Sequence, residues 1–378
     1  MTSKIAVGAT VLARGTRTGH IDGIGTYTQA LCRQFARMPG TDVSTVSWQE
    51  DLNSDLGLSH LTLPRIRMEY DLIASAITGK SSFNSAEIEK RFALFHASDH
   101  FVPRLRNIPV IASLMDPIPL MYPEWVNQRA RTLKNWLFRK EAAWADHYLT
   151  ISHAVVDDLV THFHIPRNDV TVVPLGVDDI YFTRPDATIE AEVLKKYELD
   201  PGFFLFIGTL QPRKNLKTLL EAFVKLPLST RKRNPLIVAG RLGWGCDNEV
   251  SQLRQLEKEG VAKWLDYISL DEKRALLWTA GCLVFPSLYE GFGLPVLEAF
   301  ASRLPVIGSD TTALAEVIGD AGLQVNPLDA DAMSKVMQLV ASDASLQAEL
   351  GAKGQQRARQ YTWKATAEKT VEVYKKFM

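Results

Sequence analysis

The 378-residue sequence has little cysteine, no excess charge of either sign and no long apolar run. Its three cysteines, Cys32, Cys246 and Cys282, lie far apart, which argues against a disulfide framework and against a closely spaced metal site. Lys and Arg together number 43, as do Asp and Glu, so the basic excess typical of nucleic-acid-binding proteins is missing. No apolar run approaches the roughly 18–20 residues that span a membrane.

The first residues also lack the features of a secretory leader. Residues 1–12 run directly into a strand pattern, without a longer apolar stretch and a small-residue cleavage site. Together with the scarce cysteine, this predicts a reduced, cytoplasmic protein. Hydrophobic residues make up 46% of the chain and charged residues 23%, so we expect a packed globular core.

Apolar strand-like runs alternate with helical patterns of 3.6-residue period along the whole chain. This alternation predicts an α/β fold whose parallel sheets are covered by helices. The strand-like runs are 4–7, 109–113, 147–151, 170–173, 203–207, 236–239, 282–285 and 305–307.

The length favours two domains, with a boundary around residues 180–200 where a fresh α/β pattern begins. We expect an N-terminal domain over 1–185 and a C-terminal domain over 195–361. The amphipathic segment 362–378 is expected to form a helix that packs back on the first domain. Residues 54–93 have weak periodicity, and we assign them no function.

Two segments suggest a glycine- or hydroxyl-rich loop ahead of a helix, where backbone N–H groups can face an anion. In one, Gly23, Ile24 and Gly25 precede a helical pattern. In the other, residues 308–316, Thr312 lies between a strand end and a helix start. Each pattern alone is equally typical of an ordinary turn or capped helix.

A third segment places two cations, Arg213 and Lys214, between a strand and a helix with Asn215 as its expected N-cap. The carboxyl ends of strands are where open α/β sheets bind ligands. Two cations there could hold a diphosphate through charge-assisted hydrogen bonds. An isolated Arg-Lys pair is more often a solvated turn.

The fourth segment, residues 285–298, is the most informative. We expect an exposed loop in which Gly291, Phe292, Gly293 and Leu294 offer backbone N–H groups to a phosphate. Two carboxylates flank this loop, and carboxylates suit the hydroxyls of sugar and ribose. Pro295 suits the first helical position, which would place Glu298 in the first turn of a helix and Glu290 before the loop. The combination is too specific for a helix-dipole role alone.

With these motifs the chain resembles glycosyltransferase family 4 over nearly its whole length. The resemblance implies retaining enzymes of the GT-B fold, in which two Rossmann-like domains with parallel sheets face each other across a cleft. It also implies roles for the residues above. Glu290 would contact the donor sugar and Glu298 the nucleotide ribose, while the backbone of 292–294 would line the sugar and phosphate site. Lys214, with Arg213 beside it, would bind the diphosphate near Gly23, Ile24 and Gly25.

Two motifs, 211–215 and 173–177, look like those of mannosyltransferases that build bacterial surface polysaccharides. That resemblance implies GDP-mannose as donor and a glycan or polyprenyl-linked glycan as acceptor. It also implies that no metal or other cofactor is required, since Arg213, Lys214 and helix starts would stabilise the leaving diphosphate. No nucleophile is evident, so attack on the same face of the sugar is favoured.

The chain departs from the family pattern at two positions. Thr209 stands where many relatives carry an arginine, and Met115 stands where many carry the histidine of a His-Asp pair. Asp116 is retained, and we expect it to contact a sugar hydroxyl or the acceptor. Two other readings stay open: a non-catalytic sugar-nucleotide-binding protein, and another GT-B enzyme such as a sugar-nucleotide epimerase or a phosphorylase.

Residues 125–140 read as a helix in which basic residues alternate with aromatic ones. Such a surface suits the anionic face of the inner membrane and predicts a peripheral contact there. The alternative is a solvated helix whose apolar stripe faces the core. The stripe is Val126, Ala130, Leu133 and Leu137; the surrounding residues are Arg129, Arg131, Lys134, Arg139, Lys140, Trp136 and Phe138.

Overall fold

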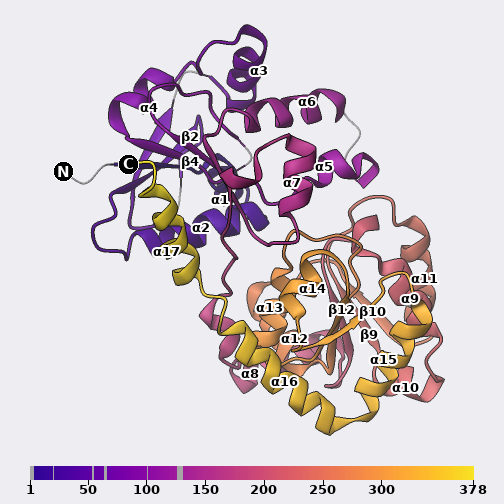
Figure 1. Cartoon of the computed structure of the whole chain (residues 1–378). Coiled ribbons are helices and arrows are strands. Elements are labelled where there is room, and N and C mark those ends of the chain that lie inside the picture. Colours follow the sequence, from indigo (N-terminus) through magenta and orange to yellow (C-terminus); the bar gives the residue numbers. More distant parts are fainter. Residues whose placement is uncertain (1–3, 20, 53–54, 64–65, 100, 126–130) are drawn as a thin grey trace. The chain divides into compact units, whose positions relative to one another are not determined.

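The computed structural model describes the chain except residues 1–3, 20, 53–54, 64–65, 100 and 126–130 (Figure 1). It consists of two compact units. The N-terminal unit comprises Met1–Gly176 together with Trp363–Met378, and the C-terminal unit comprises Val177–Thr362. The boundary between the units, at Gly176 and Val177, thus lies a few residues before the range 180–200 that the sequence pattern indicated.

The N-terminal unit contains a seven-stranded sheet in the order β3-β2-β1-β4-β5-β6-β7, and its recorded pairings are all parallel. Strand β1 pairs with β2 on one side and with β4 on the other, so the strand order switches there. The strands are β1 (Ile5–Gly8), β2 (Val43–Trp48), β3 (Ser59–Leu63), β4 (Leu94–Ala97), β5 (Val110–Ser113), β6 (His147–Thr150) and β7 (Val170–Val172).

The described helices of this unit connect these strands, and one comes from much later in the chain. They are α1 (Thr10–Thr18), α2 (Gly23–Phe35), α3 (Met68–Thr78), α4 (Ser85–Arg91), α5 (Ile118–Met121), α6 (Arg131–Ala142), α7 (Val156–Phe163) and α17 (Trp363–Tyr374). Helix α17 packs on α2, where Tyr374 meets Phe35 with ring centroids 5.9 Å apart. Residues 54–93, which had no evident period, contain β3, α3 and α4.

The C-terminal unit contains a six-stranded parallel sheet in the order β10-β9-β8-β11-β12-β13. Its strands are β8 (Phe204–Ile207), β9 (Leu236–Ala239), β10 (Ala262–Leu265), β11 (Cys282–Phe285), β12 (Val306–Ser309) and β13 (Leu323–Val325). Its helices are α8 (Ala187–Tyr197), α9 (Leu216–Val224), α10 (Leu228–Arg233), α11 (Asp247–Lys258), α12 (Leu270–Thr279), α13 (Leu294–Ala301), α14 (Thr312–Ile318), α15 (Ala330–Ser342) and α16 (Ala344–Ala358).

The central strands are buried along their whole length because helices cover both faces of each sheet. All four residues of β8, Phe-Leu-Phe-Ile, are buried, and Phe206 and Phe223 belong to one apolar core. In the N-terminal unit the core forms around Phe95 and Trp48, whose rings meet edge to face at 6.1 Å. The prediction of two Rossmann-like α/β domains with parallel sheets is therefore confirmed.

Within the described part of the chain, no helix is both long enough and apolar enough to cross a membrane. The three cysteines are free and buried, as expected for packing residues.

Candidate functional site

In the C-terminal unit, three charged residues meet at the carboxyl end of the sheet. Nζ of Lys214 lies 2.5 Å from Oε1 of Glu290, and Nη1 of Arg213 lies 2.8 Å from Oε2 of the same carboxylate. Lys214 and Glu290 are each 8% exposed. The ammonium of Lys214 also lies 4.7 Å from the centre of the Phe285 ring. The structure therefore joins two predicted motifs that are far apart in sequence.

Local hydrogen bonds hold these motifs together. The side-chain amide of Asn215 donates to the carbonyl oxygens of Pro286 and Pro327, at 3.0 and 2.6 Å. The backbone N–H of Leu288 donates to the carbonyl of Arg213 at 2.8 Å. Asn215 precedes α9 as predicted and has a left-handed backbone (φ 56°), but its side chain does not cap the helix. It ties the short 3₁₀ helix η4 (Pro212–Lys214) to the loop after β11 instead.

The Glu290 carboxylate is ionised despite its burial. Burial alone would raise the pKa of Glu290, but the nearby Lys214 and Arg213 cations lower it to about 2. Two cations beside one carboxylate leave an excess of one positive charge in a largely buried place. Such a cluster can attract an anion. Removal of one of its members would leave an unpaired charge in the protein interior, which is strongly destabilising.

The glycine loop after Glu290 is buried rather than exposed, so that prediction is wrong. Phe292 packs edge to face on Tyr361 at 5.8 Å, and this contact covers the loop. Gly293 has a φ of 118°, and a Cβ there would lie 2.7 Å from Cδ2 of Leu314. The backbone N–H of Glu290 lies 3.5 Å from the hydroxyl of Thr312, which links the loop to the start of α14.

Helix α13 begins at Leu294, so Pro295 is its second residue and not its first. No acidic residue lies in the first turn of α13, which corrects the predicted place of Glu298. Glu298 is 9% exposed and forms an ion pair with Lys273 of α12, at 2.5 Å. Burial and the adjacent Glu298 carboxylate raise the pKa of Tyr181. No pattern in the sequence indicated Lys273 or Tyr181 as a neighbour of this carboxylate.

Another group that sequence reasoning missed lies beyond the ends of β9 and β10. The guanidinium of Arg241 lies 4.8 Å from the centre of the Tyr267 ring. Tyr267 is 59% exposed, and Trp244 in the same segment as Arg241 is 43% exposed. Exposed planar groups at the carboxyl edge of a sheet can stack against a flat ring. In the sequence, Arg241 was marked only by its place after the strand-like run 236–239, and Tyr267 was not marked at all.

In the N-terminal unit, the predicted glycine segment starts α2. Asp22 is the N-cap, and its Oδ1 accepts the backbone N–H of Gly25 at 2.8 Å. This N–H is therefore already bonded within the protein. A Cβ at Gly25 would lie 2.7 Å from Ile21, whereas one at Gly23 would meet nothing within 4 Å. Steric packing explains Gly25, and the open space at Gly23 leaves room for a ligand to approach the backbone.

Asp116 follows β5, and its Oδ1 accepts the backbone N–H of Ile118 at 3.0 Å, which starts the turn into α5. Met115, at the position of the expected histidine, is 9% exposed. Gly23, Ile24, Gly25 and Asp116 thus belong to the N-terminal unit. All other predicted site residues belong to the C-terminal unit.

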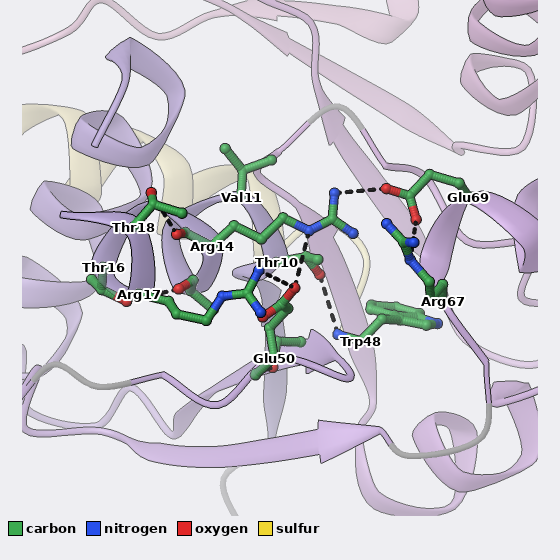
Figure 2. A network of polar contacts seen from close by, with 12 residues as sticks. Thr10, Val11, Arg14, Thr16, Arg17, Thr18, Trp48, Glu50, Arg67 and Glu69 are labelled. Atoms are coloured by element: carbon green, nitrogen blue, oxygen red, sulfur yellow. Dashed lines mark hydrogen bonds and ion pairs between the residues drawn. The ribbon is translucent and has the colours of Figure 1, made fainter. Parts of the chain in front are cut away.

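A network of ion pairs lies beside the carboxyl ends of β1 and β2 (Figure 2). Arg14 on α1 contacts Glu69 at 2.7 Å and Glu50 at 3.6 Å, and Arg17 contacts Glu50 at 3.3 Å. Thr10 accepts the backbone N–H of Trp48 at 3.3 Å, which ties the start of α1 to β2. Arg67 also contacts Glu69, at 3.8 Å, so three arginines share two carboxylates in a network that ties α1 and α3 to the sheet edge. Among the described residues, no group of three or more His, Cys, Asp or Glu side chains could hold a metal ion.

Each of the two units matches the model of a known protein family. Residues 21–180 match the family model described as Glycosyltransferase Family 4, and residues 190–357 match the model described as Glycosyl transferases group 1. O-antigen chain mannosyltransferase B of Escherichia coli is 37% identical over 228 residues, which cover 60% of each chain. O-antigen chain mannosyltransferase RfbU of Salmonella typhimurium is 29% identical over 231 residues, covering 61% of this chain and 60% of that one. The matched region thus spans about 60% of the length of these relatives.

The fold is also that of solved structures. Anabaena HepE, crystallised with UDP and glucose, superposes with a TM-score of 0.74 at 14% identity, covering 99% of this chain and 100% of that chain. At this identity the similarity shows the GT-B fold alone, as the sequence predicted.

Proposed function

Because its two domains belong to the glycosyltransferase family 4 and group 1 families, we propose that this protein is a retaining glycosyltransferase. It transfers mannose from GDP-mannose to a glycan or a polyprenyl-linked glycan during synthesis of a surface polysaccharide. The single observation that carries the proposal is the Arg213–Lys214–Glu290 cluster, in which Lys214 and Glu290 are buried. It joins two cations, which suit a diphosphate, to a carboxylate, which suits a sugar hydroxyl. The relatives named as O-antigen mannosyltransferases support the choice of sugar and pathway class.

The two cations and the carboxylate have distinct parts in this reaction. The leaving diphosphate gains negative charge as the bond to the sugar breaks, and Lys214 and Arg213 stabilise that charge without reorganising. Glu290, kept ionised by the same cations, accepts a hydrogen bond from a donor-sugar hydroxyl. Glu298, held by Lys273, accepts the ribose hydroxyls. The acceptor attacks the same face that the diphosphate leaves, and the departing phosphate takes its proton.

The guanine base is proposed to stack near Arg241 and Tyr267, which follow β9 and β10, the two strands on one side of β8. In the N-terminal unit, the open backbone at Gly23 suits a phosphate group, and Asp116 is proposed to contact the acceptor or a sugar hydroxyl. Lys214, Arg213 and the helix starts are proposed to stabilise the leaving diphosphate without a metal ion. Turnover is therefore expected to persist in excess chelator.

The decisive experiment measures nucleotide release with GDP-mannose and a bacterial lipid-linked glycan extract. Binding of GDP, UDP and ADP by calorimetry first identifies the base. Wild-type protein should release GDP, whereas Lys214→Ala should lose turnover far more than nucleoside binding. Lys225→Ala, which breaks an exposed ion pair with Asp331, serves as the control. Tight donor binding without release above the Lys214→Ala background would favour the non-catalytic binding protein, and release of free sugar without acceptor would favour an epimerase.

A peripheral contact with the cytoplasmic face of the inner membrane is also proposed, through α6. Leu133 and Trp136 are 49% and 42% exposed, and Lys134, Arg139 and Lys140 are exposed around them. Phe138 instead faces inward and packs on Phe163, and Leu137 packs against the core. Val126, Arg129 and Ala130 lie outside the described residues. The outward face is therefore apolar and basic at once, which suits an anionic membrane surface.

A further inference from the structure

A buried line of side-chain hydrogen bonds crosses the N-terminal unit and takes no part in the chemistry above. It begins at Tyr374 on α17, whose hydroxyl lies 2.6 Å from Nδ1 of His96 on β4. Nε2 of His96 lies 2.8 Å from Oγ of Ser113, the last residue of β5. The same oxygen lies 2.9 Å from the hydroxyl of Tyr27 on α2. Four elements that are distant in sequence are joined by one row of polar atoms.

Water does not compete for these bonds, because none of the four side chains is more than 4% exposed. Burial lowers the pKa of His96 to about 3, so its ring is neutral, with one nitrogen donating and the other accepting. Burial also raises the pKa of Tyr27 and that of Tyr374, which keeps both hydroxyls protonated. In a row of neutral, buried groups each hydrogen bond affects the next, so the loss of one hydroxyl disturbs its neighbours.

Two ends of the row reach segments that carry candidate site residues. Tyr27 lies in α2 directly after Gly23–Gly25, and Ser113 directly precedes the loop with Met115 and Asp116. Thr28, the residue after Tyr27, connects the start of α2 to the sheet by a second route. Oγ1 of Thr28 lies 3.0 Å from Oγ of Ser98, which donates to the carbonyl of Gly8 at 2.6 Å.

We propose that Tyr374 is a positioning residue for the transfer reaction. Through His96 and Ser113, its hydroxyl fixes the start of α2 relative to the loop after β5. The inference rests on the proposed function, because these segments matter only if Gly23 and Asp116 face substrates. Tyr374 is proposed to act on both segments through the row. A residue at position 374 thereby sets the geometry of residues near 25 and 115.

The hydroxyl can be removed without removing the helix from its place. Tyr374→Phe keeps the ring that packs against Phe35 and deletes only the oxygen. Thr370→Val is the matched control, since Thr370 is a fully buried hydroxyl of the same helix. Its Oγ1 donates to the carbonyl of Thr366 within α17 and makes no recorded bond to the row.

The experiment compares kcat, KM and melting temperature of the two variants, and hydrogen exchange of the whole protein. We expect about a tenfold to hundredfold lower kcat/KM for Tyr374→Phe than for Thr370→Val at a similar melting temperature, because small misplacements of reacting groups cost that much. Exchange should rise at residues 23–28 and 114–118 and not in the C-terminal unit.

Equal kinetics for the two variants, or exchange that is unchanged in both segments, would overturn the positioning role. If wild-type protein releases no nucleotide from any sugar nucleotide, the proposed transferase function fails. The exchange measurement still decides whether Tyr374 orders the two segments, so the two failures are distinguishable.

Discussion

The two carboxylates of the candidate site, Glu290 and Glu298, have different ion-pair partners. Glu290 is bound by the two cations of the diphosphate motif, whereas Glu298 pairs with Lys273 on a separate helix. The sequence pattern put the two glutamates on either side of one loop but gave no indication that they pair with these cations. Their separate ion pairs allow each glutamate to be tested without disturbing the other.

The ribose role of Glu298 predicts weaker binding of nucleotides in Glu298→Ala. Loss of charge-assisted hydrogen bonds should reduce the free energy of GDP binding by about 1–3 kcal/mol, as measured by calorimetry. Glu190→Ala is the control, because Glu190 is similarly buried, at 8% exposed, and forms an ion pair with Arg184. Unchanged GDP affinity in Glu298→Ala, with the fold intact, would contradict the assignment.

At the scale of elements, the start of α13 depends on one glycine. Gly293 has a positive φ of 118° and lies close to Leu314. A side chain at this position would therefore strain the backbone and clash with Leu314. Helix α14, which carries Thr312, supplies Leu314. The glycine loop is thus shaped by the packing of two helix starts and not by solvent exposure.

We predict that Gly293→Ala destabilises the protein by about 1–3 kcal/mol and shifts the loop. Gly260→Ala separates the two causes, because Gly260 has a φ of 70° but nothing within 4 Å of a new Cβ. It should cost only about 1 kcal/mol and leave GDP binding unchanged. Denaturant unfolding measures the stabilities, and equal effects of the two changes would show that the Leu314 contact is unimportant.

Helix α6 allows a second prediction at this scale. Flotation with anionic vesicles should recover wild-type protein, and Trp136→Ala should be recovered several-fold less because an interfacial aromatic anchor is lost. Trp244→Ala is matched to it, since the two tryptophans are 42% and 43% exposed. Flotation that is independent of anionic lipid, or equal losses in both variants, would remove α6 as the membrane contact.

For the whole molecule, the buried cluster predicts a loss of stability in acid. The folded-state pKa of Glu290, about 2, is below its ordinary value of 4.5, so its contribution is complete above pH 4.5 and disappears as the pH falls towards 2. At about 1.4 kcal/mol per pKa unit, this contribution is about 3 kcal/mol. Chemical denaturation between pH 5 and 2 should therefore show a flatter pH dependence in Glu290→Gln. Glu349→Gln, which alters an exposed pair with Lys353, should retain the wild-type slope.

The sequence predicted the fold class and eight of the strands because those strands are continuous apolar runs. It missed β2, in which Ser44, Thr45 and Ser47 are buried and bonded to Ser59 and His60 of β3. A strand whose polar side chains are hydrogen-bonded to the neighbouring strand has the polar composition of a loop, so the sequence alone does not reveal it. The site motifs were evident, but the contact of Lys214 with Glu290 was not, because only folding brings them together.

The N-terminal unit is built from two separate stretches of chain, and this has a consequence for protein synthesis. Domains emerge from the ribosome in order and fold as units. Residues 1–176 would emerge without α17, leaving the α2 surface around Phe35 uncovered while the uninterrupted C-terminal unit is translated. A nascent chain stalled before Trp363 would therefore contain a complete second domain and an incomplete first one. The apolar surface that α17 normally covers would be accessible to chaperones.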